Sequence, residues 1–206
     1  GSKSFFNRIG VGQLTFQSSA QLVNAILVDG DIAPEIKDLI LNRAAGNPFF
    51  MEELTHSLLE NGSIQKRDMR YILTMDISTE TIPETIHGII AARIDRLEEN
   101  LKKIIQVASV IGREFAFRIL QAITDMAQDL KLQLLNLQGL EFIYQKSLFP
   151  EMAYIFKHAI TQDVAYNSLL SAKRKKIHKK IGDAIEQIHA KNLEEFYEIL
   201  AYHYTR

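Results

Sequence analysis

The sequence predicts a mainly α-helical protein that carries two short β-hairpins. Apolar residues recur at helical spacing through most of the chain, and four prolines and ten glycines divide it into helix-sized pieces. Two stretches instead combine aromatic and β-branched residues with polar ones, which is typical of short strands. These observations predict two groups of helices, and each group is completed by a hairpin.

The first group of helices is expected in residues 15–80, which form a helical subdomain. Residues 1–14 lack a clear period and are expected to be a tail or linker, with residues 1–2 resembling an expression-vector remnant. Apolar spacing, proline and glycine predict helices over 19–28 (capped by Ser18 or Ser19), from Pro34 to before Gly46, and over 48–61. Residues 63–80 alternate apolar and polar side chains and predict a short hairpin.

The second group is expected in residues 81–190, after Pro83. Apolar stripes predict helices over about 86–97, 101–111, 117–124 and 130–140, then strands at 142–149 and 152–158 separated by Pro150 and Glu151, then one long helix over 161–189. A group of helices followed by a two-stranded wing is the order of a winged-helix domain. Residues 191–206 begin a further helix with apolar residues at helical spacing.

Composition excludes several classes of protein. The chain has no cysteine, so it holds neither disulfides nor thiolate metal sites, which fits a cytoplasmic location. Its net charge is −1, so global electrostatics do not drive it onto nucleic acid or an anionic membrane. Its densest apolar run, residues 104–112, is far shorter than the roughly 20 residues that span a bilayer. No secretory signal pattern opens it.

Four segments resemble a known family when they are taken together: GNPFFMEEL, IPETIHGIIAARIDRL, VASVIGREFAF and YIFKHAITQDVAYNSLL. They are similar to the regulatory half of STAND-type ATPases, signal-transduction members of the AAA+ superfamily, of the kind fused to class III adenylate/guanylate cyclases and tetratricopeptide repeats. The resemblance covers about residues 15–206. It implies a helical lid at 15–80 and a winged helix at 81–190, with a nucleotide-binding core upstream and helical repeats from 191–206 onward as partners in the same chain.

The resemblance also implies residues that contact nucleotide in the intact parent. Gly46, Asn47 and Pro48 stand where the family's lid turn packs beside the base and sugar, and His158 stands where a winged-helix histidine reaches the β-phosphate of ADP. A plainer interpretation leaves Pro48 as the first residue of a helix and His158 as a residue that closes the wing. Arg113 is a candidate contact to the missing core.

The chain itself is not expected to be an enzyme. It contains no GxxxxGK[ST] phosphate loop, no acidic strand end to hold magnesium and no cyclase segment, so ATP or ADP with Mg²⁺ is expected only in the intact parent. The histidines other than His158 show no metal-ligand spacing, so no metal site is predicted. A free-standing enzyme is the least favoured hypothesis.

The alternative function is DNA binding by the winged helix. The segment AKRKKIHKK gathers basic residues on the last long helix, and the candidate nucleic-acid patch is Lys175, Lys176, Lys179 and Lys180. Against it, the patch does not lie on an evident recognition helix, and the chain carries no basic excess. A solvated face is the plainer interpretation. The apolar residues of 193–206 favour self-association if they are left uncovered.

Overall fold

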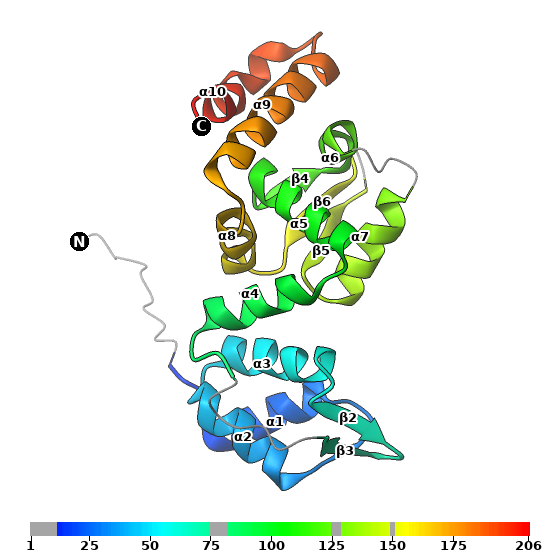
Figure 1. The fold of residues 1–206 in the computed structure, drawn as a ribbon, viewed down its shortest axis with the longest axis vertical. Coiled ribbons are helices and arrows are strands. Elements are labelled where there is room, and N and C mark those ends of the chain that lie inside the picture. The colour runs from blue at the N-terminus through cyan, green and yellow to red at the C-terminus, as the bar shows by residue number, and fades with distance from the viewer. Residues whose placement is uncertain (1–11, 75–81, 125–128, 149–150) are drawn as a thin grey trace, which may run out of the picture. The chain divides into compact units, whose positions relative to one another are not determined.

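The computed structural model describes residues 12–74, 82–124, 129–148 and 151–206 and confirms the mainly α-helical class (Figure 1). The chain divides into two compact units, residues 1–89 and 90–206, and the boundary falls within helix α4, Ile86–Arg96. Most of the predicted tail, the end of the 63–80 segment and Pro150 lie outside the described residues.

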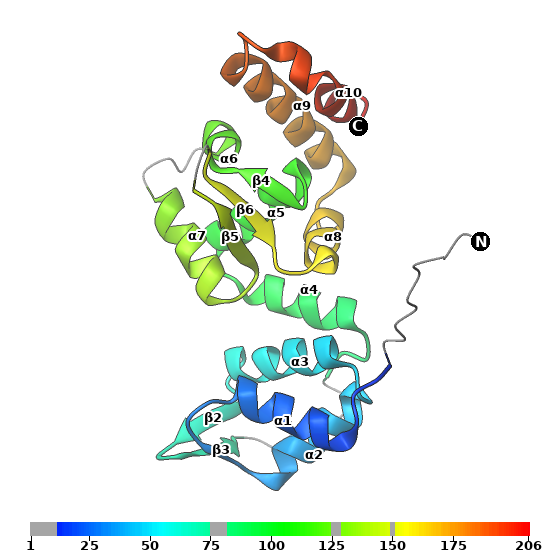
Figure 2. The ribbon, with the colours of Figure 1, turned by 180° about the vertical axis from the view of Figure 1, so that it is seen from behind.

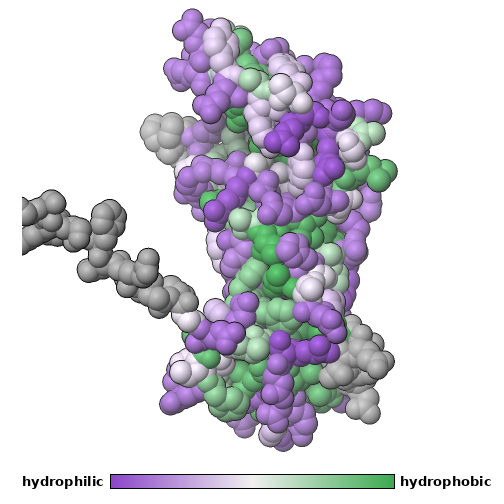
Figure 3. Space-filling view, turned by 90° about the vertical axis from the view of Figure 1, so that its left-hand side faces the viewer, coloured by the Kyte–Doolittle hydropathy of each residue, from purple (hydrophilic) through white to green (hydrophobic). Residues whose placement is uncertain are grey.

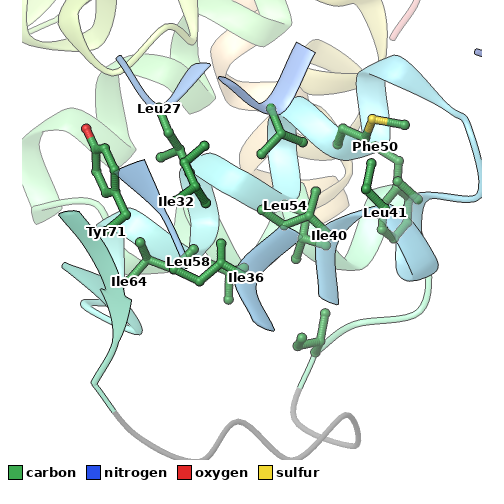
Figure 4. Close-up of a cluster of buried hydrophobic side chains, with 14 of the residues drawn as sticks. Leu27, Ile32, Ile36, Ile40, Leu41, Phe50, Leu54, Leu58, Ile64 and Tyr71 are labelled. Carbon is green, nitrogen blue, oxygen red and sulfur yellow. The ribbon is translucent and has the colours of Figure 1, made fainter. Parts of the chain in front are cut away.

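The first unit packs its helices and a small sheet around one core. Its helices are α1 (Phe16–Ile26), α2 (Pro34–Ala44) and α3 (Pro48–Glu60), and its strands are β1 (Asp31–Ile32), β2 (Ile64–Arg67) and β3 (Arg70–Leu73). Figure 4 shows side chains of these elements converging on the core, which includes Leu27, Ile36, Ile40, Leu54, Leu58 and Ile64. The predicted hairpin is confirmed for its described part.

Two features of this unit differ from the prediction. Helix α1 begins three residues earlier than expected because Thr15 caps it, with the Thr15 hydroxyl accepting from the Ser18 amide at 3.1 Å. The two-residue strand β1 was not predicted, because a periodicity argument needs a longer run. It pairs in parallel with β3, so the sheet order is β1-β3-β2.

The second unit opens with elements in the order helix, strand, helix, helix, strand, strand. These elements are α5 (Glu99–Ile111), β4 (Glu114–Ala116), α6 (Phe117–Ile123), α7 (Leu130–Gly139), β5 (Ile143–Ser147) and β6 (Ala153–Phe156). Strands β5 and β6 form the predicted hairpin. The unpredicted strand β4 adds to the other edge of β6, giving the antiparallel order β4-β6-β5 (Figure 2).

Aromatic contacts join two strands of this second sheet, and an arginine of α4 contacts the residues before the third strand. Phe115 of β4 is 1% exposed, stacks on Tyr154 with ring centroids 5.8 Å apart, and meets the edge of Phe156 at 5.7 Å. Arg93 of α4 donates to the Leu140 carbonyl oxygen at 2.9 Å, and its guanidinium lies 4.6 Å from the centre of the Phe142 ring. Aromatic contacts thus join β4 to β6, and Arg93 ties α4 to the residues that precede β5.

The prediction of a single long helix over 161–189 is wrong. The chain forms α8 (Ala159–Asn167) and α9 (Ser171–Ile188), separated at Ser168. The Ser168 hydroxyl donates to the Ala165 carbonyl oxygen at 2.6 Å and accepts from the Gln106 side chain at 3.0 Å. A serine that bonds to nearby backbone competes with the helical ladder, and the bond to α5 fixes the break in place.

The C-terminal helices lie side by side. After a short 3₁₀ turn, Leu193–Phe196, helix α10 (Tyr197–Tyr204) packs along α9 (Figure 1). Gly182 permits this approach, because a Cβ at that position would lie 2.5 Å from Cε1 of Tyr204. Figure 3 shows mostly hydrophilic surface where these helices lie. Among the described residues, no helix is both long and apolar enough to cross a bilayer.

Candidate functional site

The turn between α2 and α3 has an unusual backbone. Ala45 and Gly46 both adopt left-handed conformations, with φ of 46° and 80°. The Asn47 side-chain oxygen then accepts from the Phe50 amide at 3.2 Å, and Pro48 occupies the first helical position, where an amide hydrogen is not needed. The plainer interpretation of Pro48 therefore describes its local geometry correctly. Asn47 and Pro48 are nevertheless exposed, so the outer side of the turn is open to a binding partner.

The inner side of this turn is occupied by the chain's own N-terminal segment. The Leu14 amide donates to the Gly46 carbonyl oxygen at 2.8 Å. A Cβ at Gly46 would lie 2.8 Å from the Leu14 carbonyl oxygen and 3.0 Å from Cβ of Gln13. Gly46 is therefore required both by its positive φ and by close backbone approach. The turn is tied directly to the segment by which the chain enters this unit.

His158 precedes the first residue of α8, as the sequence predicted. It is half-buried, has an extended backbone (φ −127°, ψ 140°), and makes no capping hydrogen bond with its side chain. The side chain of His158 therefore does not cap α8. His158 belongs to the second unit, whereas Gly46, Asn47 and Pro48 belong to the first.

Arg113 lies on the surface between α5 and β4. Its side chain is exposed, and its carbonyl oxygen accepts from the Phe156 amide at 3.0 Å, which joins it to the end of β6. The neighbouring Glu114 forms an ion pair with Lys146 across the sheet. Arg113 is accordingly available for a contact with another domain.

The lysines of the candidate nucleic-acid patch divide into two faces of α9. All four are exposed, and Ile177 and Ile181 are buried behind them, as the solvated-face interpretation expects. Lys179 forms an ion pair with Asp183 at 2.7 Å, one helical turn away. Lys176 and Lys180, by contrast, line a groove beside the helix.

This groove, which we call the lysine groove, was not found from the sequence. It lies between α5 and α9, is closed by the end of α6 and by the link between α8 and α9, and has a volume of about 470 Å³. Its lining comprises Asn100, Lys103, Ile104, Gln106, Val107, Ile123, Thr124, Leu169, Lys173, Lys176, Ile177 and Lys180. The lysines at 173, 176 and 180 share a helical face with Ile177, a pattern that the sequence displays but that does not reveal the facing helix.

The structure also joins two histidines that the sequence did not connect. Nδ1 of His178 on α9 lies 2.8 Å from Nδ1 of His203 on α10, and both residues are 1% exposed. The Tyr166 hydroxyl lies 3.2 Å from Nε2 of His178. If this hydroxyl donates, His178 carries its hydrogen on Nδ1 and donates it to His203. The pair then requires that both rings be neutral.

The surroundings of this pair favour the neutral rings. Burial lowers the pKa of His203 to about 4, and the proximity of His178 adds to the effect. The pKa of His178 is lowered by burial and, after that, by the charges of Arg206 and Arg174. The histidine pair thus acts as a structural link between α9 and α10 near neutral pH.

Comparison with known proteins gives one match. Residues 16–70 match a family described as a domain of unknown function (DUF8739). The match lies within the first unit, from α1 to the start of β3, and includes the turn at Gly46. No curated protein matches the chain. The segment from α1 to the start of β3 therefore belongs to a type of domain that occurs in other proteins.

Proposed function

We propose that this chain is the lid and winged-helix part of a STAND-type signalling ATPase, of the kind associated with nucleotidyl cyclases. In this role it is a switch and not a catalyst. It couples the nucleotide state of a core elsewhere in the same protein to an output domain, with ATP or ADP and Mg²⁺ bound by that core. The observation that carries the proposal is the turn at Gly46, which is exposed on one side and tied to the incoming chain on the other.

The turn is suited to respond to a bound nucleotide because its backbone conformation is restricted at successive residues. Two left-handed residues, an Asn47 cap and a proline leave little freedom, so a contact at Pro48 moves α3 and its core as one body. The hydrogen bond between Leu14 and Gly46 joins the same body to the preceding segment. A nucleotide that contacts the turn in only one state would shift the population of lid positions.

His158 has a complementary role in this proposal. It precedes α8 and follows β6, so its backbone position is set by both the wing and the helix. An imidazole there would donate to a phosphate oxygen of ADP when the second unit closes on the core. Loss of that contact would favour the open state.

The alternative of DNA binding has less support. In the winged-helix order α7 occupies the place of the recognition helix, and its only basic residue is Lys131, whose ammonium lies 5.8 Å from the centre of the Phe117 ring. Leu132 and Leu135, 58% and 60% exposed, lie on its surface instead. Phosphate and base contacts need a basic face at this position.

Nucleotide binding tests the proposal. The chain alone should bind MgADP no tighter than the millimolar range and should not hydrolyse ATP, because the core supplies the phosphate contacts. In the natural protein that contains such a core, Pro48→Ala and His158→Ala should each weaken ADP binding, by roughly tenfold for the histidine. Lys175→Ala is the matched surface control and should leave ADP binding unchanged.

Two results would contradict the proposal. One is tight binding or turnover of ATP by the chain alone. The other is a natural protein in which neither Pro48→Ala nor His158→Ala changes ADP affinity while both variants keep their thermal stability.

A further inference from the structure

We propose that the lysine groove binds a small amphiphilic anion, namely an aliphatic carboxylate of fatty-acid type. The proposal concerns the second unit alone and does not depend on the proposed switch function. It follows from the shape of the groove, its aliphatic floor and the charges on its rim.

The floor of the groove is aliphatic. Ile104, Leu169 and Ile177 are 0%, 4% and 8% exposed, and Val107 and Ile123 are half-buried beside them. None of the described residues that line the groove is aromatic. A flat base or ring would lack a stacking partner here, whereas a flexible hydrocarbon chain can fill a floor of branched side chains.

The rim of the groove is cationic. Lys173, Lys176 and Lys180 extend from successive turns of α9, and Lys103 extends from α5 on the opposite side. Within the described part of the chain, Lys103 has Glu99 at 3.4 Å as its ion-pair partner, whereas the three lysines of α9 form no ion pair. No described lining residue is acidic. The rim therefore has uncompensated positive charge above an apolar floor.

These charges and this volume select the class of ligand. A volume of about 470 Å³ lies in the range of small-molecule sites. Lysine ammonium groups act as point charges and do not require the bidentate geometry of a guanidinium, so a single carboxylate can be shared among them. A fatty carboxylate satisfies both parts of the groove, because its chain covers the floor and its head group meets the rim.

The groove also gives the basic segment of α9 a role other than binding nucleic acid. Lys175 and Lys179 lie on the same helix but do not line the groove. A ligand in the groove depends on Lys176 and Lys180, whereas a nucleic-acid backbone spread over the helix would depend on all four lysines alike. The two pairs thus provide matched variants.

The experiment is a calorimetric titration of the whole chain with dodecanoate below its micelle concentration. The native chain should bind one dodecanoate, and decanoate should bind roughly tenfold more weakly because it lacks two methylene groups. Lys176→Glu combined with Lys180→Glu should weaken dodecanoate binding by roughly tenfold or more. Lys175→Glu combined with Lys179→Glu changes the net charge equally and should alter the affinity by less than about twofold.

Methyl NMR supplies a second readout on the native chain. Dodecanoate should shift the methyl signals of Ile104, Val107, Ile123 and Leu169, while signals of the first-unit core, such as Ile40, stay in place. This measurement keeps the test informative if a double lysine variant fails to fold.

Several outcomes would overturn the proposal. The proposal fails if the native chain does not bind dodecanoate, or if the two double variants weaken dodecanoate binding equally. It also fails if dodecanol binds as tightly as dodecanoate, or if the methyl shifts are confined to residues outside the groove. Binding to anionic phosphatidylglycerol vesicles without binding of monomeric dodecanoate would also overturn it, since the patch would then be a membrane-surface site.

Discussion

The replacement Gly46→Ala tests the link between the turn and the segment that precedes α1. Gly46 has φ of 80°, where an L-residue costs about 1–2 kcal/mol. The new Cβ would also lie 2.8 Å from the Leu14 carbonyl oxygen, a backbone atom that cannot rotate away as a side chain does. The segment must then move, which breaks the hydrogen bond from Leu14 to Gly46, worth about 1 kcal/mol.

The net effect can be estimated from these contributions. Alanine lowers the entropy of the unfolded chain, which returns about 0.4–1 kcal/mol. Gly46→Ala should therefore lower the free energy of unfolding of the first unit by about 2 kcal/mol. Gly62→Ala is the matched control, because Gly62 has φ of 76° in the same unit, but its nearest foreign atom would be Nε2 of Gln65 at 3.7 Å. It carries the backbone strain without the collision and should cost about 1 kcal/mol or less.

Native-state amide hydrogen exchange is the suitable assay, because the two units need not unfold together and exchange reads the first unit by itself. Buried amides of α2 and α3, such as those of Ile40 and Leu54, should exchange roughly 30-fold faster in the Gly46 variant. Those of the Gly62 variant should exchange about fivefold faster at most. Equal acceleration in both variants would refute the reasoning, since contact with Leu14 would then contribute nothing.

Three further predictions concern the second unit. The pKa of His203 is about 4 in the folded protein, whereas an ordinary histidine has a pKa of 6.5. The unfolded chain therefore binds more protons than the folded chain between pH 6.5 and pH 4. Stability should fall by about 3 kcal/mol as the pH drops from 6.5 to 4, and His203→Gln should abolish most of this fall in urea titrations while His189→Gln preserves it. Phe115→Ala should cost about 3–5 kcal/mol in the same titrations; a cost under about 1 kcal/mol would show that β4 does not hold the sheet. Arg93→Ala should cost about 1–3 kcal/mol, because it leaves a backbone carbonyl without its donor, and Arg93→Lys should restore part of the loss.

The sequence was most informative where a local signal acts within one turn or one helix. Pro34 and Pro48 each fix the first turn of a helix, and both helices begin at these residues. The aromatic and β-branched residues of 142–149 and 152–158 predicted the hairpin of β5 and β6 correctly. The turn at Gly46 could be singled out for the same reason, because glycine, asparagine and proline each have a local conformational preference.

Other features required the tertiary structure. Strands β1 and β4 are too short to show periodicity and exist only because β3 and β6 offer a free edge. The break at Ser168 depends on a bond from Gln106, which is 62 residues away. The lysine groove needs α5 opposite α9, and the histidine pair needs α10 beside it.

The sequence by itself thus determined the class of the fold, most helix boundaries and the chemical character of each face of α9. Only the tertiary structure decided which faces meet, because the identity of a partner surface depends on residues distant in the chain. The lysines of α9 illustrate the difference. Their spacing is visible in the sequence, but Lys173, Lys176 and Lys180 line a groove whereas Lys175 and Lys179 do not, and this follows from where α5 packs.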